Sequence, residues 1–148
     1  MVSTPQKINR IFLDTAPIIY FIERHPKYYL PLLYFFDRFD RFEYQAIISP
    51  ITIAECLIIP MRARNHELVN IFNDLFENHP GITSVSISQR EAQQAAQFRS
   101  QYNLSLLHAF QISIAIQNQC DIFLSNDKEL NRIKDIKMLL VDDLSSLA

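Results

Sequence analysis

Short apolar runs alternate along the chain with longer segments in which apolar side chains recur every three or four residues. The short runs predict β-strands, because they are rich in β-branched and aromatic residues and end at polar or proline positions. The longer segments predict amphipathic helices. Strands are predicted at residues 8–14, 45–49, 82–87, 121–125 and 137–141, and helices at residues 17–24, 28–44, 50–60, 65–78, 88–101, 105–119 and 126–133.

Predicted helices separate the predicted strands throughout, which favours parallel pairing through right-handed crossovers. The sequence therefore predicts an α/β fold in three layers, with a central parallel sheet of about five strands and helices on both faces. No internal repeat, Gly/Ser-rich linker or long like-charge block divides the 148 residues. We expect one domain that spans residues 1–148.

Two of the predicted helices contain features that need interpretation. Within residues 28–44, Phe35, Phe39 and Phe42 lie on one helical stripe, which we expect to pack on the core. The alternative is that this stripe forms a partner-binding or base-stacking surface. In the following helix, Pro60 is predicted to kink or end the helix, because proline lacks the amide donor that a helix interior needs.

Composition excludes several classes of site. The chain has one glycine, Gly81, so it contains neither the G-x-x-x-x-G-K-[ST] phosphate loop nor the G-x-G-x-x-G dinucleotide fingerprint. The two cysteines, Cys56 and Cys120, are far apart and neither belongs to a C-x-x-C pair, so a disulfide framework or a cysteine-rich zinc site is not supported. We expect Cys56 to be a buried core residue and the protein to occupy a reducing compartment.

Charge and hydropathy argue against binding to nucleic acid through a broad basic surface and against a membrane partner. The formal net charge is −2 and the isoelectric point is about 6.0, so nucleic acid could not be held by a broad basic surface. Any contact with nucleic acid must therefore depend on a local site. The apolar run at residues 16–22 is too short to cross a bilayer, and we expect a cytoplasmic protein without a membrane partner.

Three acidic residues are predicted to meet at the carboxyl edge of the sheet. Asp14 ends the first strand, Asp127 follows the fourth, and Glu55 lies in the first two turns of the helix after the second strand. Carboxylates that converge repel one another unless a cation joins them, and Mg²⁺ and Mn²⁺ prefer oxygen ligands. The pattern is compatible with a metal site, but also with helix caps and a solvated glutamate.

Three segments resemble the PIN-domain family, and in particular its VapC-type toxin ribonucleases. These segments are Ile11-Phe-Leu-Asp-Thr15, Ser49-Pro-Ile-Thr-Ile-Ala-Glu-Cys-Leu57 and the stretch from Phe98 to Asp127. Their order and spacing match the family over nearly the whole chain. The resemblance implies an α/β/α sandwich, a Mg²⁺ or Mn²⁺ cofactor, and cleavage of RNA phosphodiester bonds that leaves a 5′-phosphate. It also implies a cognate antitoxin protein as partner and a homodimer.

The resemblance assigns site residues by position. Asp14, Glu55 and Asp127 match family carboxylates that hold the metal, and Thr15 matches the hydroxyl residue beside the first of them. Ser125 and Asn126 precede Asp127 in a Ser-Asn-Asp that resembles the family's Thr-Asn-Asp.

His108 occupies the position at which the family normally has a further carboxylate, and the residues around it match. Three interpretations stay open. The imidazole ligates Mn²⁺ or a softer ion, it relays a proton near neutral pH, or the site has lost a ligand and the fold serves only binding. The sequence thus predicts a metal-dependent endoribonuclease toxin with catalytic and metal-binding Asp14, Glu55, His108 and Asp127. The alternative is a catalytically impaired domain that binds RNA or protein.

Overall fold

The computed structural model describes residues 7–147, which form a five-stranded, fully parallel sheet in the order β3-β2-β1-β4-β5. The strands are β1 (Arg10–Leu13), β2 (Gln45–Ile48), β3 (Ile82–Ser84), β4 (Ile122–Ser125) and β5 (Lys137–Leu140). The predicted α/β class and the predicted sheet are confirmed. That residues 1–148 form a single domain stays a prediction.

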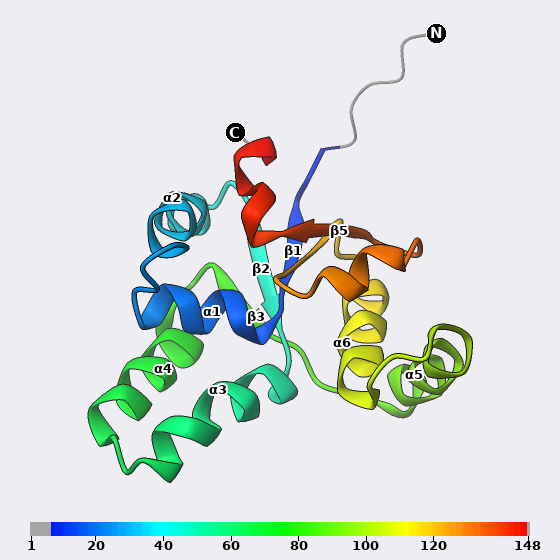
Figure 1. The fold of residues 1–148 in the computed structure, drawn as a ribbon, viewed down its shortest axis with the longest axis horizontal. Helices are drawn as coiled ribbons and strands as arrows, with labels where there is room; N and C mark the ends of the chain where they lie inside the picture. Colours follow the sequence, from blue (N-terminus) through cyan, green and yellow to red (C-terminus); the bar gives the residue numbers. More distant parts are fainter. Residues whose placement is uncertain (1–6, 148) are drawn as a thin grey trace, which may run out of the picture.

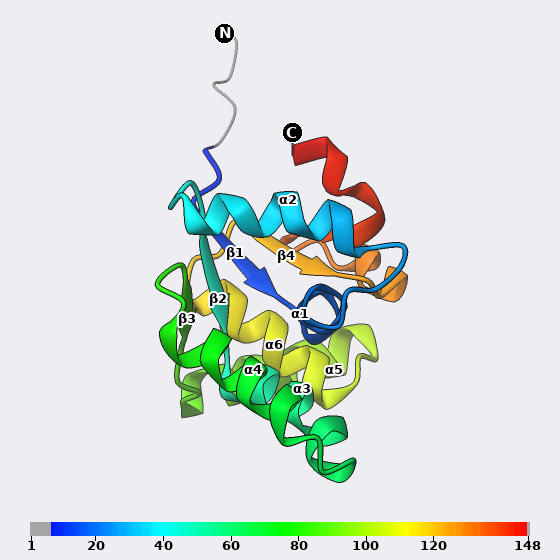
Figure 2. The same cartoon turned by 90° about the vertical axis from the view of Figure 1, so that its left-hand side faces the viewer.

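Helices cover both faces of the sheet. One face carries α1 (Thr15–Ile22), α2 (Tyr29–Asp40), α3 (Pro50–Arg62) and α4 (His66–Asn78), and the other carries α5 (Gln89–Tyr102) and α6 (Leu106–Gln117). Figure 1 shows these two groups of helices to the left and right of the sheet, and Figure 2 gives the perpendicular view. Short 3₁₀ segments, η1 (Lys128–Arg132) and η2 (Val141–Leu147), flank β5.

The strands are apolar at successive positions because both faces of the sheet are buried. Side chains alternate between the faces, so Ile11 and Leu13 of β1 join the core under α1 to α4, while Phe12 joins the core under α5 and α6. The Phe12 ring stacks on Phe123 of β4, with ring centroids 5.1 Å apart. Two cores, one on each face, therefore hold the sheet in place.

Gly81 lies where the chain passes close to the end of α2. A Cβ atom at this position would come 2.6 Å from the backbone oxygen of Phe39 at the end of α2. Such a distance is far below van der Waals contact, so any larger residue would push α2 away from the start of β3. The chain's one glycine is thus required by packing.

The structure corrects three local predictions. Pro60 does not end α3, which continues for two further residues to Arg62, and a kink at Pro60 stays a prediction. The strand predicted at 82–87 stops at Ser84, because its partner β2 ends at Ile48 and Val85 makes the last bond to that strand.

The third correction concerns the aromatic stripe. Phe35 and Phe39 are buried, as predicted, but α2 ends at Asp40 and Phe42 takes a left-handed φ of 57°. The Phe42 side chain is 68% exposed in consequence. By contrast, Cys56 is buried as expected, and burial raises the pKa of its thiol to about 12.

No helix within residues 7–147 is both long and apolar enough to cross a membrane.

Candidate active site

A cleft of about 480 Å³ opens beyond the carboxyl ends of β1 and β4. The strand order reverses between these two neighbours, since the chain runs from β1 outward to β3 and then returns to β4 on the other side. Ligands of open parallel sheets bind at such a reversal. Every site residue predicted from the sequence lines this cleft: Asp14, Thr15, Glu55, His108, Ser125, Asn126 and Asp127.

Asp14 is fixed by its position between β1 and α1. Its side chain caps α1, because Oδ1 accepts a hydrogen bond of 2.8 Å from the backbone N–H of Thr15. Oδ2 accepts a hydrogen bond of 2.8 Å from the Ser125 hydroxyl on β4. Asp14 is 6% exposed, so its carboxylate is almost buried and held in one orientation. The helix-cap role and a metal-binding role are compatible in this geometry.

Glu55 reaches the cleft from α3. The Thr15 hydroxyl donates a hydrogen bond of 3.0 Å to Glu55 Oε1, which links α3 to the start of α1. Ser49 and Thr52 form a capping box that fixes the first turn of α3, and Glu55 follows one turn later. Thr15 thus orients the glutamate, as a hydroxyl residue beside a carboxylate can.

Asp127 lies in the turn after β4. Its backbone N–H donates to the Ser125 hydroxyl oxygen at 3.1 Å, and its Oδ1 accepts a hydrogen bond of 3.0 Å from the backbone N–H of Glu129. Ser125 therefore contacts both Asp14 and Asp127. The hydroxyl thus links the Asp14 carboxylate to the backbone of Asp127, which comes from the opposite end of the chain.

His108 lies near the start of α6 with its ring between two carboxylates. Nε2 is 3.6 Å from Asp14 Oδ2, and Nδ1 is 3.7 Å from Asp127 Oδ2. These are ion-pair separations. The pKa of His108 is raised above its ordinary value. The main cause is the interaction of its ring with the Asp14 side chain, and the negative charges of Asp14, Asp127 and Glu55 add to it, while partial burial acts in the opposite direction.

This arrangement predicts that His108 stabilises the metal-free protein at low pH. A histidine whose pKa is higher in the folded than in the unfolded chain stabilises the fold when it is protonated. This stabilisation is complete below the pKa of the unfolded chain, about 6.5, and disappears as pH rises through the pKa of the folded chain. The free energy of unfolding of the wild type should therefore exceed that of His108→Gln by an amount that is largest below about pH 6.5 and shrinks as pH rises through the raised pKa of His108. Urea denaturation in EDTA measures this difference, and a difference independent of pH would contradict the ion pairs.

The donor set suits a hard divalent cation, because carboxylate oxygens from three separate segments line one cleft with an imidazole beside them. As the side chains stand, the part of the chain that the structure describes contains no group of three or more His, Cys, Asp or Glu residues placed to hold a metal ion. The residue types and the cleft that they share nevertheless fit such an ion.

Three cleft residues on α1 were not predicted from the sequence: Ala16, Ile19 and Tyr20. The Tyr20 hydroxyl accepts a hydrogen bond of 3.1 Å from Asn126 Nδ2, which positions the residue before Asp127. These residues could have been predicted from the helical period, because Ile19 and Tyr20 lie one turn after Thr15 and Ala16 on the same helix face.

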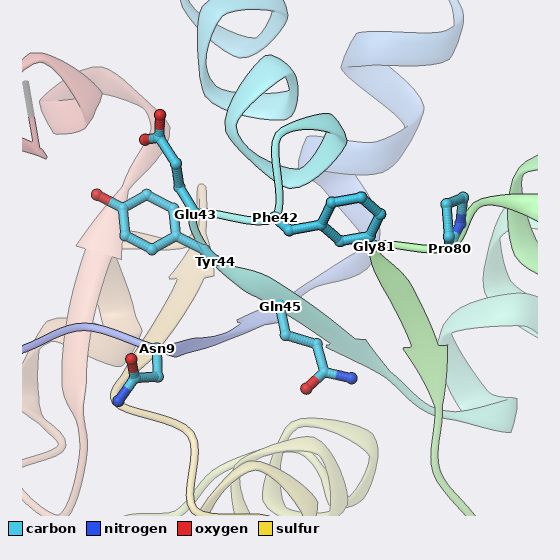
Figure 3. A pocket seen from close by; sticks show the side chains of 7 residues that line it. All are labelled: Asn9, Phe42, Glu43, Tyr44, Gln45, Pro80 and Gly81. Carbon is cyan, nitrogen blue, oxygen red and sulfur yellow. The ribbon is translucent and has the colours of Figure 1, made fainter.

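A second cavity, of about 270 Å³, lies at the opposite, amino-terminal edge of the sheet. It is lined by Gln45, the first residue of β2, and by residues that precede β1, β2 and β3, and Figure 3 shows the exposed Phe42 ring pointing toward Gly81 there. Glu43 is the one acidic side chain among its lining residues. This cavity lacks the converging carboxylates of the first, so the cleft at β1 and β4 is the candidate active site.

The fold and the acidic cleft define an α/β protein with a carboxylate-lined site at the point where strand order reverses. Residues 11–136 match the family model described as PIN domain, and the chain belongs to the PIN-domain family. The expected family membership is therefore confirmed. No curated protein matches the chain in sequence.

Solved structures of toxin–antitoxin proteins share the fold. VapBC2 from Rickettsia felis, bound to a DNA fragment from its promoter, is 18% identical with a TM-score of 0.70, over 88% of this chain and 98% of that one. VapBC from Salmonella typhimurium, bound to DNA, is 17% identical with a TM-score of 0.67, over 90% and 99%. VapC20 from Mycobacterium tuberculosis, a toxin that cleaves the sarcin-ricin loop, is 10% identical with a TM-score of 0.66, over 86% and 98%.

Proposed function

We propose that this protein is a metal-dependent endoribonuclease and the toxin of a toxin–antitoxin pair. The observation that carries the proposal is the convergence of Asp14, Glu55 and Asp127, from three distant segments, on one cleft with His108 between two of them. Membership of the PIN-domain family and the shared fold with VapC toxins support it.

Asp14, Glu55 and Asp127, together with His108, would hold Mg²⁺ or Mn²⁺. The bound ion supplies an activated water and neutralises the charge that grows on the scissile phosphate. An ion is needed to neutralise the charge on the phosphate, because the described residues that line the cleft include neither lysine nor arginine. A polyanionic substrate would otherwise meet three carboxylates.

The remaining cleft residues orient these groups. Thr15 donates to Glu55, and Ser125 donates to Asp14 while it accepts from the backbone of Asp127. Asn126, held by Tyr20, presents an amide next to Asp127. His108 would ligate a metal only as the neutral imidazole, so a doubly protonated ring would have to lose one of its two N–H protons first.

The proposal extends to partners and location. The neighbours with this fold include toxin–antitoxin complexes, VapBC2 from Rickettsia felis and a complex from Klebsiella pneumoniae among them. We propose a cognate antitoxin and an RNA substrate as partners, a homodimer as the assembly, and the cytoplasm as the location.

Titration of the purified protein with Mn²⁺ and with Mg²⁺ in an RNA-cleavage assay tests the function. We expect cleavage that depends on the added ion, that EDTA abolishes, and that produces fragments with a 5′-phosphate. An RNA that binds but is not cleaved at any concentration of either ion would contradict the enzyme. That outcome would instead favour an impaired domain that serves as a binding module.

A further inference from the structure

A fully buried polar cluster joins α3 to α6 and takes no part in the chemistry described above. Its members are Ser49, Thr52 and Gln111, each 0% exposed. The Ser49 hydroxyl donates a hydrogen bond of 2.7 Å to Gln111 Oε1, and Gln111 Nε2 donates one of 3.0 Å to Thr52 Oγ1. The carboxamide of Gln111 is thus satisfied at both ends by the first turn of α3.

This link crosses between the two layers of helices. α3 packs in the core on one face of the sheet, and α6 packs in the core on the other. The sheet separates most of these two cores, and α3 reaches the core under α6 through Ile51 of its first turn. The hydrogen bonds of Gln111 add a polar link between the two helices at that same turn. Gln111 bridges them beyond the end of β2, where Ser49 follows the strand.

Each end of the bridge lies one helical turn from a cleft residue. Thr52 precedes Glu55 by three residues on α3, and Gln111 follows His108 by three residues on α6, which places each pair on neighbouring turns of one helix face. A buried polar cluster that is fully satisfied is rigid, because any displacement leaves a donor or acceptor unpaired away from water.

We propose that Gln111 is a positioning residue that sets the spacing of Glu55 and His108 across the cleft. The inference rests on the proposed function, because the spacing of Glu55 and His108 matters for activity only if both side chains would hold the same ion. The two side chains come from helices on opposite faces of the sheet. Gln111 touches neither the ion nor the substrate.

Gln111→Met tests the inference, because methionine keeps the length of the side chain and removes both hydrogen bonds. Ser113→Ala is the matched control. Ser113 is also 0% exposed on α6, but its hydroxyl contacts Glu91 and Gln94 of α5, which carries no cleft residue. Both variants lose buried hydrogen bonds of the same helix, and only Gln111→Met breaks the link to α3.

Two measurements on the full chain separate positioning from general destabilisation. We expect Gln111→Met to weaken the Mn²⁺ Kd, measured by calorimetry, by about 10- to 100-fold. We expect kcat for RNA cleavage to fall by about 10- to 100-fold while KM stays within about twofold. Ser113→Ala should leave Kd and kcat within about twofold of the wild type even where its melting temperature is lower. Equal effects of the two variants, or no effect of Gln111→Met, would overturn the inference.

A second pair of variants covers the case in which Gln111→Met does not fold. Thr52→Val removes the hydroxyl that accepts from Gln111 and from the backbone N–H of Ser49, and it keeps the shape, while Thr52→Ser keeps the hydroxyl. We expect loss of Mn²⁺ affinity in Thr52→Val and near wild-type affinity in Thr52→Ser. Equal Mn²⁺ affinity in these two variants would argue against the bridge.

The proposed function can fail separately from this inference. If the wild type binds Mn²⁺ but cleaves no RNA, the enzyme proposal fails and the Mn²⁺ affinities still decide the role of Gln111. If the wild type neither binds Mn²⁺ nor cleaves RNA, crystal structures of the variants test the role of Gln111. The separation of the Glu55 and His108 Cα atoms should change in Gln111→Met and not in Ser113→Ala. An unchanged separation in both variants would overturn the positioning role.

Discussion

Replacing Asp14 with asparagine is expected to abolish metal-dependent RNA cleavage, with a fall in kcat/KM of about 1,000-fold or more. The substitution removes the charge of the most buried carboxylate in the cleft and leaves its shape intact. Cleavage of a labelled RNA in Mn²⁺, with the protein in excess, measures the effect on the chemical step.

The fold should tolerate this change. Asparagine is as good a helix cap as aspartate, so its side-chain oxygen still accepts from the backbone N–H of Thr15. The Ser125 hydroxyl can turn to accept from the new amide. At a pH where His108 is neutral, removal of one of three nearby negative charges should leave the free energy of unfolding unchanged or higher.

Asp74→Asn provides the matched control. Asp74 is an exposed aspartate on α4 whose carboxylate accepts a hydrogen bond from Asn78, and it lines a different surface hollow. This variant should cleave RNA at the wild-type rate. If Asp14→Asn cleaves as fast as Asp74→Asn, the cleft between β1 and β4 is not the active site.

The location of the cleft could be predicted from the sequence because it follows from the periodicity of the strands. Once the runs that end before Asp14 and Asp127 are recognised as parallel strands, their carboxyl ends must meet at one edge of the sheet. The helix start at Ser49 and Pro50 then places Glu55 near the same edge. These inferences need only local pattern and topology.

The polar link through Gln111 could not be predicted in this way. Gln111 lies among apolar residues of α6, and its partners Ser49 and Thr52 are about sixty positions earlier in the chain. No spacing rule connects them, since the contact exists only after both helices have packed on opposite faces of the sheet. The hydrogen bond from Asn126 to Tyr20 was missed for the same reason.

The aromatic stripe was predicted to be longer than it is, because its spacing in the sequence continues past the end of the helix. Phe42 continues the helical spacing of Phe35 and Phe39, but α2 ends at Asp40 and the backbone turns at Phe42 into the left-handed region. Spacing alone does not say where a helix ends. The end of α2 at Asp40, with Arg41 as the C-cap, has to be read from the structure.

His108→Asp is expected to change which metal supports cleavage. The wild type should be more active with Mn²⁺ than with Mg²⁺, because an imidazole nitrogen suits Mn²⁺ better and three carboxylates give less charge than four. An aspartate at this position replaces nitrogen with oxygen and adds a negative charge, so Mg²⁺-supported kcat/KM should rise by about 10-fold or more. Parallel cleavage assays in the two ions measure the ratio, and His108→Asn, which lacks both the imidazole and the charge, should be poor with either ion.

The pH profile gives a second, independent readout of the same substitution. In the wild type, Asp14 and Asp127 raise the pKa of His108 above its ordinary value, so the protonated ring competes with the ion over a range that extends above about pH 6.5. Activity at low Mn²⁺ should therefore fall as pH decreases through the pKa of His108. The profile of His108→Asp should be flatter over that range, because the variant has no imidazole in the cleft to take up a proton. If both the metal ratio and the pH profile are the same in the two proteins, His108 does not ligate the ion, and its ring serves only as a neighbour that lies between Asp14 and Asp127.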